Sequence, residues 1–428
     1  MKIIYSKSKN FDKLLDILLS KRKKKLKSSS VSVIKIINDV KKNGDKAVLK
    51  YERKFNKNKI IVPSVKQVNK SIKSLDKKVK KAIDDAYKRI YKFHSLQKFK
   101  NISYRDKYKN KIYYKYLPIE SVGIYVPGST VSYPSSVLMN AIPAIVAGVR
   151  RIVMINPGYK GNQNAAVLYA AKKCKIKEIY SIGGPSAIAA ISYGTKKIKP
   201  VNKIVGPGNS YVATAKKEVF GDVGIEGMTA GPSEITIVCD KYSNPKWLAS
   251  DLVGQAEHDS LAQCILISKD KKILEKVKLE TLKQLNEISR SSVAKKSLLN
   301  NGILMHINSD TKILEIINKI GPEHLELNVR NYKSFIPKIK NAGSVCLGKF
   351  AVMAMTDYGV PGTNHVLPTN MTSKYSSGLS VSEFIKKISY INLSKKGIET
   401  LGPSVITLAK YERLEGHAQS IIKRIRRN

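Results

Sequence analysis

The feature that most constrains this fold is a repeated alternation of short apolar runs with longer helical segments, which begins near residue 121 and continues past residue 340. The apolar runs are rich in Val and Ile, and most of them end at Gly, Pro or Asn. Such runs are typical of strands buried on both faces, and the helical segments between them suit crossover connections. The pattern therefore predicts a parallel, doubly wound α/β sheet.

Two series of this alternation follow one another, one before and one after Gly231. We therefore expect two related, incomplete Rossmann-like domains with mostly parallel strands, flanked by helical N-terminal and C-terminal appendages. The expected strands are residues 122–126, 151–155, 178–182 and 203–205 in the first series, and 235–239, 264–268, 304–306, 325–327 and 344–347 in the second. The expected helices are residues 135–149, 164–173, 185–193, 210–219, 245–258 and 271–288.

The two ends of the chain are polar and rich in Lys. Val33, Ile36, Ile37 and Val40 recur at the spacing of one helix face, so the region before residue 120 is expected to be helical in part. Residues 380–428 are expected to form a polar helical tail rather than a third core.

The net charge is strongly positive, because Lys and Arg together number 78 against 32 acidic residues, which gives +46. A charge of this size can indicate a nucleic-acid or membrane partner. The excess is Lys rather than Arg, it is spread along the chain apart from residues 21–25, and it accompanies many Ile, Asn and Tyr, whose codons are also rich in A and T. We interpret the charge as compositional drift of exposed positions, and we expect neither a nucleic-acid partner nor a membrane partner.

The cysteines indicate a reducing compartment. Cys174, Cys239, Cys264 and Cys346 form no C-x-x-C pair, so neither a disulfide framework nor a thiolate zinc site is expected. The first 19 residues lack the apolar stretch of a secretory signal, and the longest apolar stretch is shorter than the roughly 20 residues that a membrane span needs. We expect a soluble cytoplasmic protein.

One glycine-rich turn lies where an open sheet binds ligands. Gly-Pro-Gly-Asn at residues 206–209 follows a predicted strand and precedes a predicted helix, although it is not a G-x-G-x-x-G sequence. Asn209 is either the N-cap of that helix or a contact to a ligand at its N-terminus. The local pattern leaves both interpretations open.

Several of the six His residues lie beside other potential ligands or proton carriers. Gln255 and His258 are three residues apart on one predicted helix face, a usable but unspecific pair of metal ligands. Glu323 and His324 follow a Gly-Pro turn, which suits proton transfer or is simply a polar turn. Asp357 and His365 flank a glycine-rich loop, and Glu412 and His417 lie in the tail; His94 and His306 are expected to be structural.

Taken together, these strings resemble the L-histidinol dehydrogenase family, and the resemblance covers essentially the whole chain in the family's order. The matching strings are Gly-Ile-Tyr-Val-Pro-Gly (123–128), Val-Gly-Pro-Gly-Asn-Ser-Tyr-Val (205–212), Ala-Gly-Pro-Ser-Glu (230–234), Gln-Ala-Glu-His (255–258), Gly-Pro-Glu-His-Leu (321–325), Gly-Thr-Asn-His-Val-Leu-Pro-Thr (362–369) and Glu-Arg-Leu-Glu-Gly-His (412–417).

The resemblance implies a homodimer that oxidises L-histidinol to L-histidine through L-histidinaldehyde, with two NAD per substrate and one Zn²⁺ per subunit. By position, the zinc ligands are Gln255, His258, Asp357 and His417, the last coming from the partner subunit. This set of N and O donors is compatible with zinc.

The resemblance also assigns roles to individual residues. Glu323 would activate water and His324 would act as general base. The other expected contacts are Ser233, Glu412 and His365, together with the metal ligands and His324, for the substrate, and Tyr125, Ser186 and Asn209 for the dinucleotide.

Three departures from the family pattern affect the expected site. Ser186 stands where the family usually has Gln, and Ser129 stands where it usually has Gly; both changes fall on expected dinucleotide contacts. One extra residue separates Asp357 from His365, and we expect it to bulge at residues 360–361 and leave Asp357 as a ligand.

The expected division of the chain also follows the family. It comprises an N-terminal helical arm (1–20), a discontinuous first α/β domain with the metal and catalytic residues (21–124 and 236–378), a second α/β domain on the dinucleotide side (125–235) and a C-terminal helical appendage that contributes to the partner subunit (379–428).

Two other functions are compatible with parts of the sequence. A basic nucleic-acid binder is favoured only by the net charge, and it would need clustered Lys and Arg interleaved with aromatic residues. A metal-dependent enzyme of the same fold that acts on another amino alcohol is left open by Ser186 and Ser129.

Overall fold

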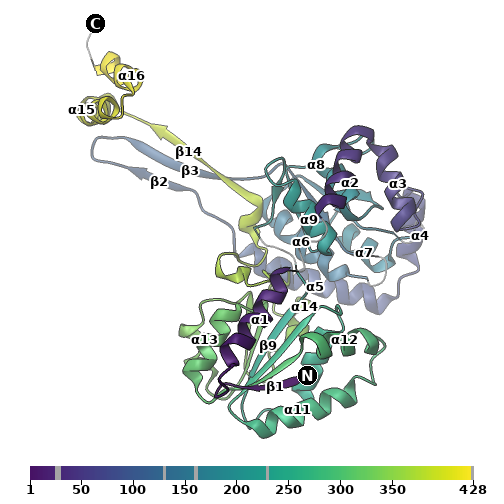
Figure 1. Ribbon diagram of the computed structural model, residues 1–428. Helices are drawn as coiled ribbons and strands as arrows, with labels where there is room; N and C mark the ends of the chain where they lie inside the picture. Colours follow the sequence, from purple (N-terminus) through teal and green to yellow (C-terminus); the bar gives the residue numbers. More distant parts are fainter. Residues whose placement is uncertain (25–29, 129–131, 159–161, 228–230, 426–428) are drawn as a thin grey trace. The chain divides into compact units, whose positions relative to one another are not determined.

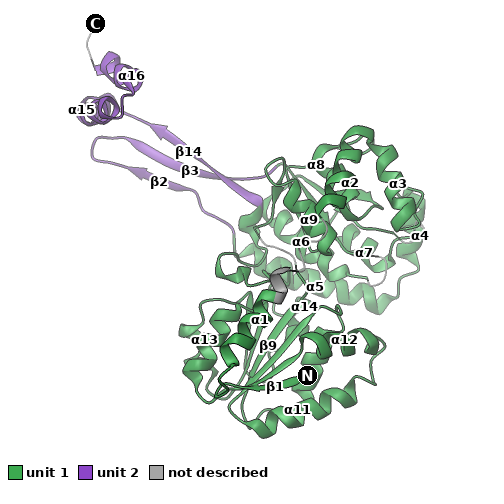
Figure 2. Ribbon diagram, in the orientation of Figure 1, with its two compact units in different colours: residues 1–97, 120–383 green, residues 98–119, 384–428 purple. Residues whose placement is uncertain are grey.

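The computed structural model describes residues 1–24, 30–128, 132–158, 162–227 and 231–425, so Ser129 lies outside the described residues. These residues form two compact units (Figure 2). Unit 1 contains residues 1–97 and 120–383, and unit 2 contains residues 98–119 and 384–428. None of the described helices is long and apolar enough to span a bilayer.

The first sheet of unit 1 has five parallel strands in the order β6-β5-β4-β7-β8. The strands are β4 (Ser121–Tyr125), β5 (Arg151–Ile155), β6 (Glu178–Tyr180), β7 (Lys203–Val205) and β8 (Gly224–Ile225). The helices that alternate with them are α6 (Pro134–Ala147), α7 (Ala165–Lys173), α8 (Gly184–Tyr193) and α9 (Ser210–Glu218).

The second sheet of unit 1 has six parallel strands in the order β1-β11-β10-β9-β12-β13. The strands are β1 (Lys2–Tyr5), β9 (Glu234–Cys239), β10 (Gln263–Ser268), β11 (Ile303–His306), β12 (His324–Asn328) and β13 (Ser344–Leu347). The helices of this series are α10 (Pro245–Ala256), α11 (Lys271–Gln284), α12 (Ser291–Asn301), α13 (Asp310–Ile320) and α14 (Met353–Asp357).

Both sheets have the same topology, so the predicted pair of related doubly wound folds is confirmed (Figure 1). In each series the first strand along the chain is central, the second and third lie on one side of it, and the fourth and fifth lie on the other. The strand order therefore reverses beside β4 and β7 in one sheet, and beside β9 and β12 in the other.

Strict alternation of side chains gives the second sheet a core on each face. Ile237 and Leu266 pack with α10, α11 and α12, whereas Val238 and Ile267 pack with α13 and with the N-terminal helix α1 (Phe11–Lys24). Because the strands are covered on both sides, they read as continuous apolar runs, which is why the sequence located them.

The N-terminal residues differ from the expected helical arm. Residues 2–5 form strand β1, which pairs in parallel with β11 at the edge of the second sheet. The helix α1 begins only at Phe11, which is buried together with Leu15 and Leu19. A short run such as Lys-Ile-Ile-Tyr has no local signal that distinguishes an edge strand from a helix start, since the partner strand lies 300 residues away in the chain.

Helices from the N-terminal region cover the first sheet. They are α2 (Ser30–Asn43), α3 (Asp45–Phe55), α4 (Val65–Lys73) and α5 (Lys77–Ser95). Val33, Ile37 and Val40 of α2 are buried in the core that also contains Ile155 and Ile188, so the predicted apolar helix face is confirmed. Helices α2 and α3 thus share a core with the first sheet, and the four-part division of the chain stays a prediction.

Unit 2 contains a three-stranded antiparallel sheet in the order β14-β3-β2 and two helices. Its elements are β2 (Ile102–Arg105), β3 (Lys111–Pro118), β14 (Ile385–Asn392), α15 (Lys395–Tyr411) and α16 (Glu415–Ile425). The expectation that residues 380–428 are helical throughout is therefore wrong for β14. This strand pairs along its whole length with β3, a partner remote in the sequence that no local pattern reveals.

Short 3-10 turns complete the fold at Tyr332–Ser334, Ile336–Lys338, Thr372–Lys374 and Val381–Phe384. All four cysteines are buried and carry free thiols, and Cys239 and Cys346 lie in strands β9 and β13 as expected for packing residues.

Candidate active site

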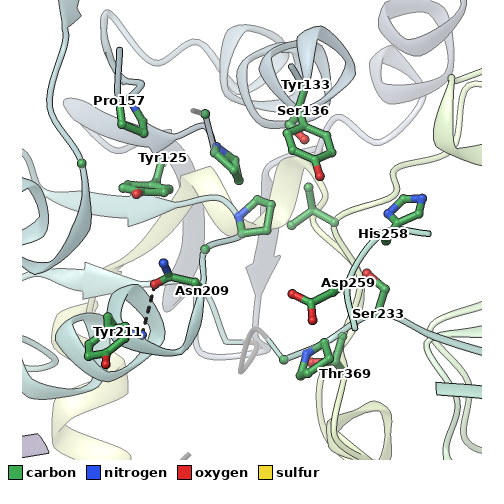
Figure 3. A pocket seen from close by; sticks show the side chains of 18 of the residues that line it. Tyr125, Tyr133, Ser136, Pro157, Asn209, Tyr211, Ser233, His258, Asp259 and Thr369 are labelled. Carbon is green, nitrogen blue, oxygen red and sulfur yellow. Dashed lines mark hydrogen bonds between the residues drawn. The ribbon is translucent and has the colours of Figure 1, made fainter. Parts of the chain in front are cut away.

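A cavity of about 1200 Å³ opens in unit 1 and is lined from both α/β series. In Figure 3, Tyr125 and Asn209 lie on one side of this cavity, and His258, Asp259 and Ser233 lie on the other. All the expected site residues of unit 1 line it: Tyr125, Ser186, Asn209, Ser233, Gln255, His258, Glu323, His324, Asp357 and His365.

The wall built by the first sheet lies at the carboxyl ends of its strands. Tyr125 is the last residue of β4, and the Gly-Pro-Gly turn at 206–208 directly follows β7, the strand beside β4. This is the point where the strand order reverses, which is where open α/β sheets bind nucleotides. We call this surface the carboxyl-edge wall.

Three helices begin at the carboxyl-edge wall: the first residues of α6 and α8 line the cavity, as do Asn209 and Tyr211 at the start of α9. Asn209 is the N-cap of α9, because its Oδ1 accepts hydrogen bonds from the backbone N–H groups of Tyr211 and Val212, each at 3.1 Å (Figure 3). The capping interpretation of Asn209 is thus correct, and Asn209 also lines the cavity. Helix N-termini favour anions, so this wall suits phosphate groups.

Tyr125 and Ser186 hold the turn that begins α8. The backbone N–H of Gly184 donates to the Tyr125 hydroxyl at 3.1 Å, and the Ser186 hydroxyl donates to the carbonyl oxygen of Gly183 at 3.1 Å. Burial raises the pKa of Tyr125 to about 12, which keeps the phenol protonated. The hydroxyl of Ser186 therefore forms its hydrogen bond within the turn that begins α8.

The opposite wall is built by the second sheet at the amino ends of its strands. Ser233 directly precedes β9, Glu323 directly precedes β12, and His324 is the first residue of β12. Gln255 and Asp357 lie in the last turns of α10 and α14, which run back toward the same edge. We call this surface the amino-edge wall.

The expected Glu-His pair is buried and lies beside a second carboxylate. The backbone N–H of Glu234 donates to Glu323 Oε2 at 2.8 Å, which fixes that carboxylate. His324 Nε2 lies 4.0 Å from Glu323 Oε1 and 3.8 Å from Asp357 Oδ1. Burial, with smaller effects of His365 and His258 and against the opposing effect of Asp357, lowers the pKa of His324 to about 4, so the ring is neutral near pH 7.

His365 is held by protein groups on both ring nitrogens. Its Nδ1 lies 2.8 Å from the backbone carbonyl oxygen of Asp357, and its Nε2 lies 3.4 Å from the Ser136 hydroxyl. Burial lowers the pKa of His365. The ring therefore ties the glycine-rich loop back to the end of α14 and fixes the backbone at Asp357.

The donors on the amino-edge wall fit a divalent cation. Gln255 Oε1 is buried and has no hydrogen-bond partner among the described residues. Because a buried acceptor normally has a partner, this oxygen is suited to coordinate a cation. His258 and Asp357 line the same cavity, and they add an imidazole nitrogen and carboxylate oxygens. Within the described ranges, no group of three or more His, Cys, Asp or Glu side chains is placed to hold a metal ion.

Two of the expected site residues belong to unit 2. Glu412 is the C-cap residue of α15, His417 lies in α16, and both are exposed. Neither is among the residues that line the cavity. Their contribution to a site stays a prediction.

Sequence reasoning missed several groups of this site. Phe55 and Asn56, at the end of α3, and Ser32, in α2, line the cavity although nothing in their local sequence indicates a ligand. Glu52 of α3 is buried, and it accepts a hydrogen bond from the backbone N–H of Gly183 at 2.7 Å. The one available signal was its spacing, since Glu52 follows the apolar Val48 by four residues and so shares its face if the segment is helical.

The model of one protein family, histidinol dehydrogenase, matches residues 19–425. The chain is 76% identical over 427 residues to a curated histidinol dehydrogenase of Pelagibacter ubique (strain HTCC1062), with 100% of both chains covered. It is 41% identical over 420 residues to the histidinol dehydrogenase of Brucella suis biovar 1 (strain 1330), with 97% of each chain covered.

A solved structure has the same fold. The crystal structure of histidinol dehydrogenase from Elizabethkingia anophelis superposes with a TM-score of 0.91 at 35% sequence identity, covering 99% of this chain and 98% of that one.

Proposed function

Because this chain belongs to the histidinol dehydrogenase family, we propose that it oxidises L-histidinol to L-histidine through L-histidinaldehyde, in two NAD-dependent steps. Histidinol dehydrogenases are oxidoreductases of histidine biosynthesis. The observation that carries the proposal is the convergence of Gln255, His258, Glu323, His324 and Asp357, from segments far apart in the chain, in one cavity.

We assign the metal site to Gln255, His258 and Asp357, with His417 of the partner subunit as fourth ligand. A zinc ion bound there would fix the imidazole and amine of the substrate and so orient the carbinol carbon. The orphaned Gln255 Oε1 and the two helix C-termini at this wall support a cation at this position.

We assign dinucleotide binding to the carboxyl-edge wall, with Tyr125, Ser186 and Asn209 as contacts. Bound NAD would accept the hydride in each oxidation. The positive ends of the α8 and α9 dipoles at this wall favour its phosphates, and Tyr125 holds the turn before α8 in place.

His324 is the general base in both oxidations. Its ring is neutral because burial lowers its pKa to about 4, so Nε2 is available to accept the proton of the substrate hydroxyl. The positive charge that results is stabilised by Asp357 and Glu323, whose oxygens lie 3.8 and 4.0 Å from Nε2. Release of this proton returns the His324 ring to its neutral form before the second oxidation.

Glu323 prepares the second oxidation. The aldehyde must add water to give a hydrate, and Glu323 takes a proton from that water while its other oxygen stays fixed by the Glu234 N–H. Ser233 and His365 line the pocket around the substrate, as does Glu412 by the family resemblance. Keeping the aldehyde in the cavity between steps prevents loss of a reactive compound.

The proposal is tested by NADH absorbance with limiting L-histidinol. We expect two NADH per substrate, loss of activity on chelation, and recovery when zinc is added. No NADH from the purified, zinc-loaded protein would refute the proposal. Equal rates with amino alcohols that lack the imidazole would instead favour an enzyme of the same family fold with another substrate.

We also propose a homodimer whose active sites are shared between subunits. Support comes from the family resemblance of residues 412–417 and from the exposure of Glu412 and His417 in unit 2. Co-expression of His324→Ala chains with His417→Ala chains should restore part of the activity, because each mixed dimer retains one intact site. Mixed dimers without activity would contradict sharing.

A further inference from the structure

Two carboxyl groups that take no part in the proposed chemistry face each other behind the amino-edge wall. Asp251 lies on α10, one helical turn before Gln255, and Glu326 lies on β12, two residues after His324. Glu326 is 1% exposed, and its carboxyl group neighbours that of Asp251. A hydrogen bond between the two requires a proton, because two ionised carboxylates have only acceptors.

The unpaired oxygens of this pair indicate where that proton lies. Asp251 Oδ2 and Glu326 Oε2 are both buried, and neither has a donor among the described residues. One shared proton would satisfy both oxygens. Burial raises the pKa of Asp251 to about 6 and raises that of Glu326 well above its usual range, with the neighbouring Asp251 adding to the effect on Glu326.

The other oxygen of Glu326 holds the helix that ends in Asp357. Its Oε1 accepts a hydrogen bond from the backbone N–H of Met353, the first residue of α14, at 2.7 Å. The N-cap residue of this helix, Val352, offers no side-chain acceptor. Glu326 therefore replaces a missing cap and fixes a helix that is only five residues long.

The pair thus connects the three elements that carry the proposed chemistry. Asp251 and Gln255 share one face of α10 because they are four residues apart. Glu326 and His324 point to the same face of the sheet because they are two residues apart on β12. The Met353 bond adds α14, whose last residue is Asp357.

We propose that Asp251 and Glu326 share one proton and act as positioning residues, which hold Gln255 and Asp357 at the separation that a bound divalent cation requires. This inference rests on the proposed metal site. Groups that orient metal ligands typically change metal affinity by about 10- to 100-fold when removed.

The experiment measures zinc affinity by competition with a chromophoric chelator, with thermal unfolding recorded for each variant. Glu326→Ala should bind zinc about 10- to 100-fold more weakly, because α14 loses its acceptor and Asp251 loses its partner. Glu326→Gln should bind within a few-fold of the unmodified chain, since its Oε1 accepts from Met353 while its Nε2 donates to Asp251.

Glu52→Ala is the matched control. Glu52 is also a buried carboxylate that accepts a backbone N–H, but it lies in helix α3, which packs on the first sheet. This variant should lower thermal stability and leave zinc affinity unchanged. If Glu326→Ala does not fold, Asp251→Ala serves instead, since it keeps the bond from Met353. Cobalt(II) spectra give a second readout, because a displaced ligand changes the visible bands.

Equal zinc affinity and equal cobalt spectra for Glu326→Ala and the unmodified chain would overturn the inference. So would equal losses in Glu326→Gln and Glu326→Ala, because a shared proton predicts rescue by the amide. An unmodified chain that binds no stoichiometric zinc, or a Gln255→Ala variant with unchanged affinity, would instead refute the proposed metal site itself, and with it the need for positioning residues.

Discussion

The two sheets of unit 1 share one strand order but present opposite edges to the same cavity. The β4 sheet offers the carboxyl ends of its strands, where Tyr125 and the 206–208 turn lie. The β9 sheet offers the amino ends of its strands, where Ser233 and His324 lie. The same topology can therefore supply two different kinds of surface, depending on which edge is used.

The helix ends give the two walls of the cavity opposite electrostatic preferences. Helices α6, α8 and α9 begin at the carboxyl-edge wall, and the positive ends of their dipoles favour anionic groups of a ligand. Helices α10 and α14 end at the amino-edge wall, and the negative ends of their dipoles favour a cation. Nearly all the ionisable side chains of the proposed site are on the amino-edge wall, so chemistry and dinucleotide binding are separable by mutation.

The largest expected effect separates proton transfer from metal binding within the amino-edge wall. His324→Ala should lower kcat by about 100- to 10,000-fold, because a general base contributes that much, and should keep its zinc. His258→Ala should lose zinc affinity instead. Metal analysis together with steady-state kinetics checks both, and equal loss of zinc in the two variants would show that the assigned roles are wrong.

The next effect tests the carboxyl-edge wall. Gly206 has φ of +107°, and a Cβ there would overlap the backbone carbonyl of Tyr125. Gly206→Ala should therefore destabilise the protein by roughly 2–5 kcal/mol and raise the KM for NAD. Zinc affinity should not change, because the other sheet is untouched.

Denaturant unfolding and NAD titration measure these quantities. Gly227→Ala is the control, since a Cβ there meets open space. Unchanged NAD binding in a stable Gly206→Ala variant would contradict the division of roles between the walls.

The pH dependence of folding stability tests the role of Glu52, the buried carboxyl group that holds the backbone at Gly183 in the carboxyl-edge wall. Burial raises the pKa of Glu52 from 4.5 to about 7, so the folded protein binds this proton more tightly than the unfolded chain does. Stability should fall by about 1–3 kcal/mol as the pH rises from 4.5 through 7, and then level off. Glu52→Gln should remove this change of stability with pH, as measured by unfolding curves recorded at several pH values. The same pH dependence in the variant would show that other groups cause it.

The smallest expected effect concerns Ser186, where the family usually has a longer amide. Ser186→Gln should lower the KM for NAD by a few-fold and leave kcat and zinc affinity unchanged, because only the carboxyl-edge wall gains a contact. Ser186→Ala is the control, since it removes only the bond to the Gly183 carbonyl. A change in zinc affinity would show that the two walls are coupled.

The sequence predicted the core of unit 1 well because its strands are buried on both faces and so read as apolar runs. It missed β1 and β14 because edge strands are defined by remote partners rather than by their own residues. Motif strings located the cavity residues, but not their contacts with one another, such as the bond from the Gly184 N–H to the Tyr125 hydroxyl. One sequence feature pointed to Glu326, because it is a carboxyl residue between two leucines in an apolar run. Its partner could not be predicted, because Asp251 is remote from it in the sequence.

The pairing of β14 with β3 has a consequence for synthesis on the ribosome. Strand β3 leaves the ribosome long before Ile385–Asn392, so the nascent chain must carry an open sheet edge while most of unit 1 is being made. Open edges invite aggregation, and Lys side chains along a strand discourage it. Lys111 and Lys115 lie on β3 itself, and Lys386 and Lys387 lie on the strand that completes it. Part of the basic composition would thus protect the unfinished chain.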